Sequence, residues 1–307
     1  MEKRKIGSLE VSLAGIGCNN FGWRIDADGT AGVVSAAIEA GINFFDTADV
    51  YGAGQSEEYL GLALKGRREK VLIATKFGMK MGEGKEGAKP AYIRQAAEDS
   101  LRRLETDHID LYQIHKPDPS TPIADTLGVL DELVKAGKVR EIGCSNFSAE
   151  QLQEAARVQS GAHFVSVQNN YSLLHREPEA EVLPECQRQG IAFLPYFPLA
   201  NGLLTGKYRK GQPFPKSSRA EDAFGPKVFT DENLALADQL RALAESRGHT
   251  LLELSMAWLA AKKEIASVIA GAKTPEQAKA NASAVAWRLS EADLAAVEGI
   301  LTSKAHG

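Results

Sequence analysis

The chain has 307 residues, of which 44% are hydrophobic and 25% charged, and its formal net charge is −4 at pH 7. This composition excludes a disordered, collagen-like or coiled-coil protein, and the charge gives no electrostatic reason to expect nucleic acid or an anionic membrane as a partner. The most apolar stretches are only about ten residues long and contain prolines, so they are too short to cross a bilayer.

The N-terminal residues predict a β-hairpin, with strands at 4–6 and 9–13 and a turn at Gly7-Ser8. Eight short apolar runs then predict further strands. They lie at residues 13–17, 42–48, 71–76, 108–115, 139–145, 164–168, 191–196 and 266–271. Because these runs are almost continuously apolar, they indicate strands covered on both faces, as in a parallel sheet.

Segments with helical periodicity separate the strands. They lie at residues 30–41, 56–66, 90–104, 124–138, 148–159 and 179–190. Gly41 suits a helix C-cap, Ser56 an N-cap and Pro90 a first helical turn. After the seventh strand, a long polar stretch precedes two helices at 231–247 and 250–262, and two more helices follow the eighth strand at 275–284 and 290–301.

Eight strands that each lead into a helix predict a (β/α)8 TIM barrel, here with an N-terminal β-hairpin and extra C-terminal helices. Since barrels of this kind routinely exceed about 250 residues as one domain, we expect residues 1–307 to form a single domain. An open, doubly wound sheet is the alternative that this pattern leaves open.

Several motifs carry no chemistry here. Residues 82–87 match the dinucleotide fingerprint GxGxxG, but they lie between a strand that ends near Lys76 and a helix that begins near Pro90, so no tight strand-to-helix turn surrounds them. No Walker A, GxSxG or HExxH pattern is present, and the cysteines lack zinc spacing, so we expect no metal site.

The ends of the predicted strands carry a different set of residues. Asp46 ends the second strand, Tyr51 follows it, and Lys76 and His115 end the third and fourth. Because reactive groups of α/β barrels lie at the carboxyl ends of the strands, these four side chains should converge. Each has a purely structural alternative: an ion pair of Asp46 with Lys76, a core histidine, or a rim aromatic.

This set of four suits acid catalysis. The pKa of a free tyrosine is near 10, and a neighbouring ammonium should lower it, while a carboxylate keeps the lysine charged. The imidazole can position a carbonyl oxygen by a hydrogen bond. The arrangement serves a reaction in which that oxygen gains negative charge, and the hydride must then come from a cofactor.

The sequence as a whole resembles the aldo-keto reductase family, in particular the branch with bacterial aldo/keto reductases and potassium-channel β-subunits. The resembling stretches follow family order, at residues 15–18, 44–61, 73–78, 110–119, 137–147, 167–174, 196–208 and 268–281. The resemblance implies a catalytic tetrad of Asp46, Tyr51, Lys76 and His115, with Tyr51 as proton donor. A related branch that reduces carbon–carbon double bonds has glutamate in place of the histidine, so His115 favours reduction of an aldehyde or ketone.

The resemblance also implies an NADPH (NADP+) site. Ser145, Asn146 and Gln168 match residues that hydrogen-bond the nicotinamide carboxamide, and Tyr196 matches the aromatic that stacks on the ring. Further matches are Leu199 and Gly202 along the pyrophosphate, Lys207, Arg219, Gly271, Lys273 and Gln277 in the region of the 2′-phosphate, and Asn281 at the adenine.

Two of these assignments leave alternatives. Lys207 and Arg219 are also compatible with solvated loop charges. Many family members have arginine where Gln277 stands, so the grip on the phosphate is expected to be weaker and some use of NAD is compatible with the sequence.

For the carbonyl substrate, Trp23 and Phe77 are expected to line an apolar pocket with Tyr51, and Tyr171 and the residues near Phe224 are further candidates. Two other functions compete with reduction: a Schiff-base lyase that uses Lys76, and a regulatory module that keeps the cofactor but turns over slowly.

The cellular setting is also an expectation. The three cysteines are odd in number and widely spaced, and no long apolar run marks a signal peptide, which indicates a reducing cytoplasm. The sequence leaves the oligomeric state open, and a monomer is compatible with it.

Overall fold

The chain opens with the expected hairpin. In the computed structural model, which describes residues 1–159, 161–214, 220 and 225–302, β1 (Lys3–Ile6) pairs antiparallel with β2 (Leu9–Ser12). Gly7 turns the chain with a φ of +56°, and a Cβ there would lie 2.6 Å from the Glu141 carboxylate. Glu141 in turn accepts a hydrogen bond from Ser8 N at 2.7 Å, so the turn must be a glycine because the hairpin is held against the barrel wall.

The eight further strands form a parallel barrel, which confirms the expected fold. They are β3 (Ala14–Gly17), β4 (Phe44–Asp46), β5 (Leu72–Phe77), β6 (Ile109–Ile114), β7 (Val139–Ser145), β8 (Phe164–Asn170), β9 (Ala192–Tyr196) and β10 (Val268–Gly271). Their order is β10-β3-β4-β5-β6-β7-β8-β9. The two ends of this sheet meet, since Phe193 N donates to Glu264 O at 2.7 Å and Ala266 N donates to Phe193 O at 3.2 Å. The alternative of an open sheet is therefore wrong.

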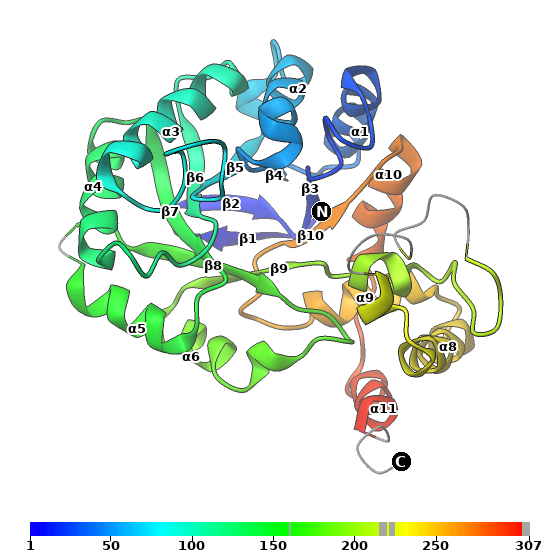
Figure 1. Ribbon diagram of the computed structural model, residues 1–307. Helices are drawn as coiled ribbons and strands as arrows, with labels where there is room; N and C mark the ends of the chain where they lie inside the picture. Colours follow the sequence, from blue (N-terminus) through cyan, green and yellow to red (C-terminus); the bar gives the residue numbers. More distant parts are fainter. Residues whose placement is uncertain (160, 215–219, 221–224, 303–307) are drawn as a thin grey trace.

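Helices surround the strands, and the hairpin lies over the middle of the ring (Figure 1). The main helices are α1 (Ala27–Glu39), α2 (Gln55–Ala63), α3 (Pro90–Leu104), α4 (Ile123–Lys135), α5 (Ala149–Val158), α6 (Val182–Gln189), α8 (Asp231–Ser246), α9 (Leu251–Ala260), α10 (Pro275–Ala284) and α11 (Glu291–Thr302). Shorter turns are η1 (Tyr51–Gly54), η2 (Arg68–Lys70), η3 (Glu177–Glu179), η4 (Ala200–Thr205) and α7 (Gly225–Val228).

One predicted cap is wrong. Ser56 does not cap α2, which begins at Gln55; its hydroxyl is buried and donates to Cys18 O at 2.9 Å. Tertiary contacts outweigh the local capping preference at this position.

Alternation along the strands decides which side chains enter the barrel. Phe44, Ala74 and Leu111 form an inner apolar cluster with the hairpin residues Ile6, Leu9 and Val11. Because side chains of a strand alternate between faces, the residues two positions further along point into the barrel as well. Those residues are Asp46, Lys76 and Gln113, so the barrel interior changes from apolar to polar toward the carboxyl ends of the strands.

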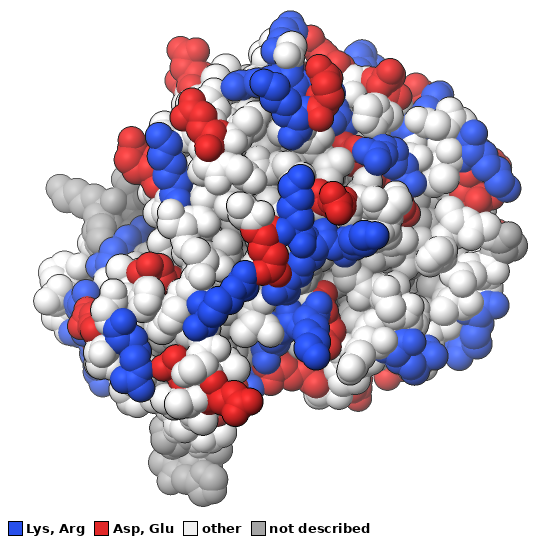
Figure 2. Space-filling model, turned by 180° about the vertical axis from the view of Figure 1, so that it is seen from behind, with Lys and Arg blue, Asp and Glu red and all other residues white. Residues whose placement is uncertain are grey.

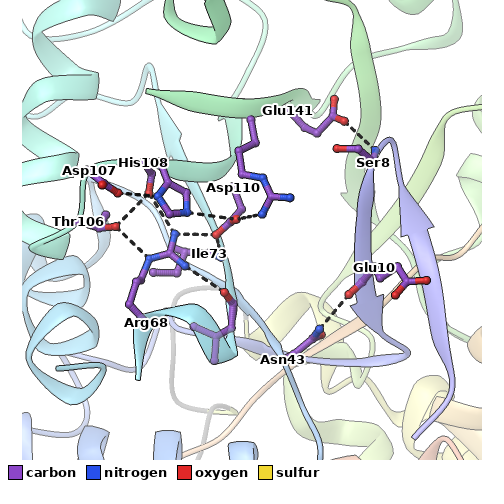
Figure 3. Close-up of polar contacts among 12 residues, drawn as sticks. Ser8, Glu10, Asn43, Arg68, Ile73, Thr106, Asp107, His108, Asp110 and Glu141 are labelled. Carbon is purple, nitrogen blue, oxygen red and sulfur yellow. Dashed lines mark hydrogen bonds and ion pairs between the residues drawn. The ribbon is translucent and has the colours of Figure 1, made fainter. Parts of the chain in front are cut away.

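The hairpin end of the barrel carries charges of both signs. Figure 2 shows Lys and Arg side chains near the centre of the face seen from behind, with Asp and Glu among them. Lys3, Lys5 and Glu10 of the hairpin line a hollow of about 510 Å³ together with Lys70 and Arg140. Beside it, buried Asp110 accepts hydrogen bonds from Arg68 and Arg140, both at 2.7 Å (Figure 3).

The described part of the chain lacks two features. None of its helices combines the length and the apolar character needed to cross a bilayer. Its histidines, cysteines and carboxylates form no group of three or more arranged to hold a metal ion.

Candidate active site

The structure brings the four expected side chains together at the carboxyl ends of β4, β5 and β6. Lys76 has no exposed surface, and its Nζ lies 2.6 Å from Asp46 Oδ2 and 2.8 Å from Thr47 O. The same Nζ lies 5.2 Å from the centre of the Tyr51 ring. The rings of Tyr51 and His115 meet edge to face, with centroids 5.8 Å apart.

The segment after β4 folds Tyr51 back over Lys76. It continues along β5, since Thr47 N donates to Ala74 O at 2.8 Å and Asp49 N donates to Lys76 O at 3.1 Å. The chain then reverses in η1, where Gly52 has a φ of +58° and a Cβ would lie 3.0 Å from Gly22 O. Glycine directly after Tyr51 is therefore required for the turn that places the phenol.

The immediate surroundings keep Lys76 charged. Burial alone lowers the pKa of its amine, but Asp46 and then Tyr51 outweigh this effect, so the net pKa lies above the usual value. The second carboxylate oxygen, Asp46 Oδ1, accepts from Gln168 Nε2 at 2.8 Å and Gln113 Nε2 at 3.1 Å. The ion pair is thus fully hydrogen-bonded, as a buried pair must be.

The net pKa of Tyr51 differs in direction from the expectation. Burial raises this pKa, and the ammonium of Lys76, which lowers it, does not compensate. The physical reason is that Lys76 shares its charge with Asp46, whose carboxylate also disfavours a phenolate. Tyr51 is consequently protonated at neutral pH and able to donate.

His115 is neutral at physiological pH. Burial, followed by the charges of Lys76 and Lys116, lowers the pKa of the imidazole to about 3. Its Nδ1 is buried and has no hydrogen-bond partner among the described residues. The backbone of His115 is fixed on both sides, because its N donates to Phe77 O at 2.8 Å and its O accepts from Asn146 Nδ2 at 2.9 Å.

A cleft of about 680 Å³ begins at Tyr51 and His115, within the range of small-molecule sites in proteins. The expected carboxamide-binding residues line it next to the tetrad: Ser145, Asn146, Gln168 and Tyr196. They form one network, in which Tyr196 OH donates to Asn146 Oδ1 at 2.9 Å and Ser145 Oγ donates to Gln168 O at 2.7 Å. Asn146 adopts a φ of +62°, which turns its amide toward this network.

The cleft continues to the first turns of α10. Its lining there includes Leu199, Gly202, Lys207, Gly271, Lys273, Gln277 and Asn281, all of them expected cofactor contacts. Gln277 Oε1 accepts from Lys273 N at 2.8 Å, which fixes the turn before the helix. Arg219 lies outside the described residues.

The expected substrate contacts need correction. Phe77 is fully buried, with its ring 4.8 Å from that of Tyr112, because it follows Lys76 on the strand and points to the opposite face. Tyr171 is also fully buried, and its hydroxyl donates to Glu179 Oε1 at 2.6 Å. Trp23 is 61% exposed and is not part of the cleft lining. Phe224 lies outside the described residues.

Other residues line the cleft near the tetrad. They are Met79 and Lys116, together with Asn19 and Asn20 after β3. Gln113, which holds Asp46, was also missed. Its position in the sequence, two residues before His115 on a predicted strand and therefore on the same face, is the signal that could have found it.

We expect Gln113→Leu to lower the free energy of unfolding by about 1.5–3 kcal/mol, the usual range for a hydrogen bond to a charged group. The substitution removes a bond to a buried carboxylate while keeping the side-chain volume similar. Urea denaturation measures the loss. Gln153→Leu is the matched control, since it removes a 3.1 Å bond to Glu185 at a partly exposed position. If both variants lose the same free energy of unfolding, burial does not increase the contribution of the Gln113 hydrogen bond.

Comparison with known proteins agrees with this geometry. The model of the Aldo/keto reductase family matches residues 14–302. The chain is 37% identical to the aldo-keto reductase YhdN of Bacillus subtilis over 303 residues, which cover 95% of this chain and 91% of that protein.

Two solved structures are similar throughout. The glycerol dehydrogenase AKR11B4 from Gluconobacter oxydans superposes with a TM-score of 0.85 at 33% identity, covering 98% of this chain and 95% of that one. The aldo-keto reductase AKR11C1 from Bacillus halodurans, in its holo form, gives a TM-score of 0.82 at 34% identity, covering 98% and 96%. With its barrel, its tetrad geometry and these relatives, the chain belongs to the aldo/keto reductase family and is an oxidoreductase.

Proposed function

We propose that the protein is an NADPH-dependent reductase that converts an aldehyde or ketone to an alcohol, with Tyr51 as the proton donor. The observation that carries the proposal is the Tyr51 phenol between the Lys76 ammonium and the neutral His115 imidazole, at the mouth of a long cleft. A phenol in this position can donate to a carbonyl oxygen as that oxygen gains negative charge.

The donor set of the cleft fits a nicotinamide dinucleotide. The amides of Asn146 and Gln168 and the hydroxyl of Ser145 can satisfy the donor and acceptor atoms of a carboxamide, and the Tyr196 ring offers a stacking face. Lys207 and Lys273 offer cations for a phosphate at the other end. When bound, the reduced cofactor supplies the hydride.

The residues of the chain then handle the proton. His115, being neutral, can donate a hydrogen bond to the carbonyl oxygen without giving up charge. Tyr51 transfers its proton to that oxygen, and the resulting phenolate is stabilised by Lys76. Asp46 holds Lys76 in place, and Gln113 and Gln168 in turn donate to Asp46. The charged state of Lys76 disfavours the Schiff-base lyase, because imine formation requires a neutral amine.

The experiment that tests the proposal is a panel of aldehydes and ketones assayed by the loss of NADPH absorbance and repeated with NADH. We expect turnover with NADPH and less with NADH. Absence of turnover with both cofactors, together with slow hydride transfer in a single turnover, would favour the regulatory module instead.

The cofactor preference gives a further prediction. Neutralising Lys207 and Arg219 together, as Lys207→Met and Arg219→Met, should weaken NADPH binding by at least about tenfold and leave NADH binding nearly unchanged, since only NADPH has the 2′-phosphate. Fluorescence titration with each cofactor measures both affinities. Lys210→Met, an exposed lysine of the same region, is the control. An equal loss for both cofactors would refute the assignment of these residues to the phosphate.

We also propose that residues 1–307 form one domain that works in a reducing compartment. The three cysteines, Cys18, Cys144 and Cys186, are free and buried. Arg4 in β1 donates to Ala260 O and Ile265 O, both at 2.6 Å, and so joins the start of the chain to its last third.

A further inference from the structure

The end of the cleft beside the tetrad has a cation that the proposed reaction does not use. Three lysines are among the described residues that line the cleft: Lys116, Lys207 and Lys273. Lys207 follows η4 and Lys273 precedes α10, whereas Lys116 directly follows His115. The charge of Lys116 acts on the imidazole, because it contributes, after burial and Lys76, to the lowered pKa of His115.

The surroundings leave the charge of Lys116 available to a ligand. It forms no ion pair with any residue in the described part of the chain. The nearest acid in sequence, Asp118, is occupied with its own loop: it accepts from Ala88 N at 2.7 Å, from Ser120 N at 2.9 Å and from Thr121 Oγ1 at 3.0 Å.

These contacts also fix the position of Lys116. His115, the residue before it, is hydrogen-bonded through its backbone to β5 and to Asn146. Asp118, two residues after it, accepts a hydrogen bond from Ala88 N. Lys116 therefore lies on a short, firmly held connection at the rim of the cleft, and its side chain is exposed to an incoming ligand.

The sum of charges at this end is positive. Among the described residues that line the cleft, Asp46 is the only one with a carboxylate, and this carboxylate is paired with Lys76. His115 is neutral and Tyr51 is protonated, which leaves the ammonium of Lys116, on the residue after His115, as the uncompensated charge in the cleft lining at this end. A ligand that brings a negative group would complete this charge balance.

From these observations we propose that Lys116 makes the site selective for carbonyl compounds that carry a carboxylate, by pairing with that group while the carbonyl oxygen faces Tyr51 and His115. This inference rests on the proposed function and narrows its substrate class. The apolar Met79 on the same stretch of the cleft would contact the carbon chain between the two groups.

The test compares two probes that differ in one charge, 4-carboxybenzaldehyde and its methyl ester, in steady-state assays with NADPH. The wild-type protein should prefer the acid. Lys116→Met should lower kcat/KM for the acid by about tenfold, mainly through KM, and change it for the ester by less than about twofold. Lys116→Arg should keep the preference, because it keeps the charge. Lys85→Met, an exposed lysine outside the cleft lining, serves as the matched control.

The outcomes separate this inference from the proposed function. If Lys116→Met lowers kcat/KM equally for acid and ester, or leaves the ratio between them unchanged, Lys116 does not select a carboxylate. If Lys116→Met also raises the KM of NADPH by about tenfold, Lys116 contacts the cofactor and the proposal is overturned as well. If the wild-type protein reduces neither these probes nor any other carbonyl compound of the panel, the proposed function fails. The selectivity for a carboxylate is then tested by calorimetry, with the acid titrated into wild type and Lys116→Met, each saturated with NADP+. Tenfold weaker binding of the acid to the variant supports this selectivity, and equal binding refutes it.

Discussion

Tyr51→Phe should reduce turnover of an aldehyde by at least about 10²-fold while leaving the affinity for NADPH nearly unchanged, since loss of a general acid costs about 10²–10⁴-fold in rate. The substitution removes only the hydroxyl and keeps the ring that packs against His115. The ammonium of Lys76 does not replace it readily, because Lys76 is fully buried and paired with Asp46.

Steady-state kcat and a fluorescence titration with NADPH measure the two quantities. Tyr59→Phe, the same change at a partly buried position on α2, is the control and should leave both unchanged. The pH profile adds an independent readout. Because burial raises the pKa of Tyr51, the donor stays protonated through neutral pH, so wild-type kcat should fall only at strongly alkaline pH as this proton is lost. Turnover of Tyr51→Phe close to that of the wild type would remove Tyr51 from its role.

Arg103→Leu should lower the free energy of unfolding by about 3–5 kcal/mol, the usual effect of removing one partner of a buried ion pair. The pair joins α3 to α2: Arg103 Nε is 2.7 Å from Glu57 Oε2, and the Glu57 side chain has no exposed surface. Thr75 Oγ1 donates to the other oxygen at 2.5 Å. Asp49 depends on the same guanidinium, because burial and then Glu57 raise its pKa to about 7 while Arg103 lowers it.

The predicted loss also depends on pH. An aspartate in the unfolded chain has a pKa near 4, so Asp49 binds more protons in the folded state and its contribution to stability declines as the pH rises from about 4 to about 7. Without Arg103 the pKa of Asp49 should rise further, so this decline should continue to higher pH, and the deficit of the variant should be largest above pH 7 and smaller in acid.

Urea denaturation at several pH values measures this deficit. Arg94→Leu is the matched control, since its pair with Glu132 is exposed, with 49% and 59% of the two side chains accessible, and should be worth less than about 1 kcal/mol. If Arg94→Leu and Arg103→Leu lose the same stability, or if the deficit of Arg103→Leu does not depend on pH, the buried acid cluster does not have the role assigned to it.

The sequence by itself determined the order of the elements and the strand ends that carry Asp46, Lys76 and His115. These features depend on local information: apolar runs of strand length, helical periodicity, and turn residues such as Gly7. The bounds of α10 agree with the expected range, because Thr274 as N-cap and Pro275 in the first turn are local signals. The general position of the tetrad then follows from the geometry of any parallel barrel.

Only the tertiary structure decided which neighbours these residues have. Phe77 was expected in the pocket, but its ring packs against Tyr112 from the neighbouring strand. Gln113 and Gln168 meet at Asp46 from strands far apart in the sequence, and Arg103 reaches Glu57 from another helix. The net pKa of Tyr51 depends on burial and on how Lys76 divides its charge, which are properties of packed neighbours. Contacts of this kind are set by three-dimensional packing, and no local pattern in the chain encodes them.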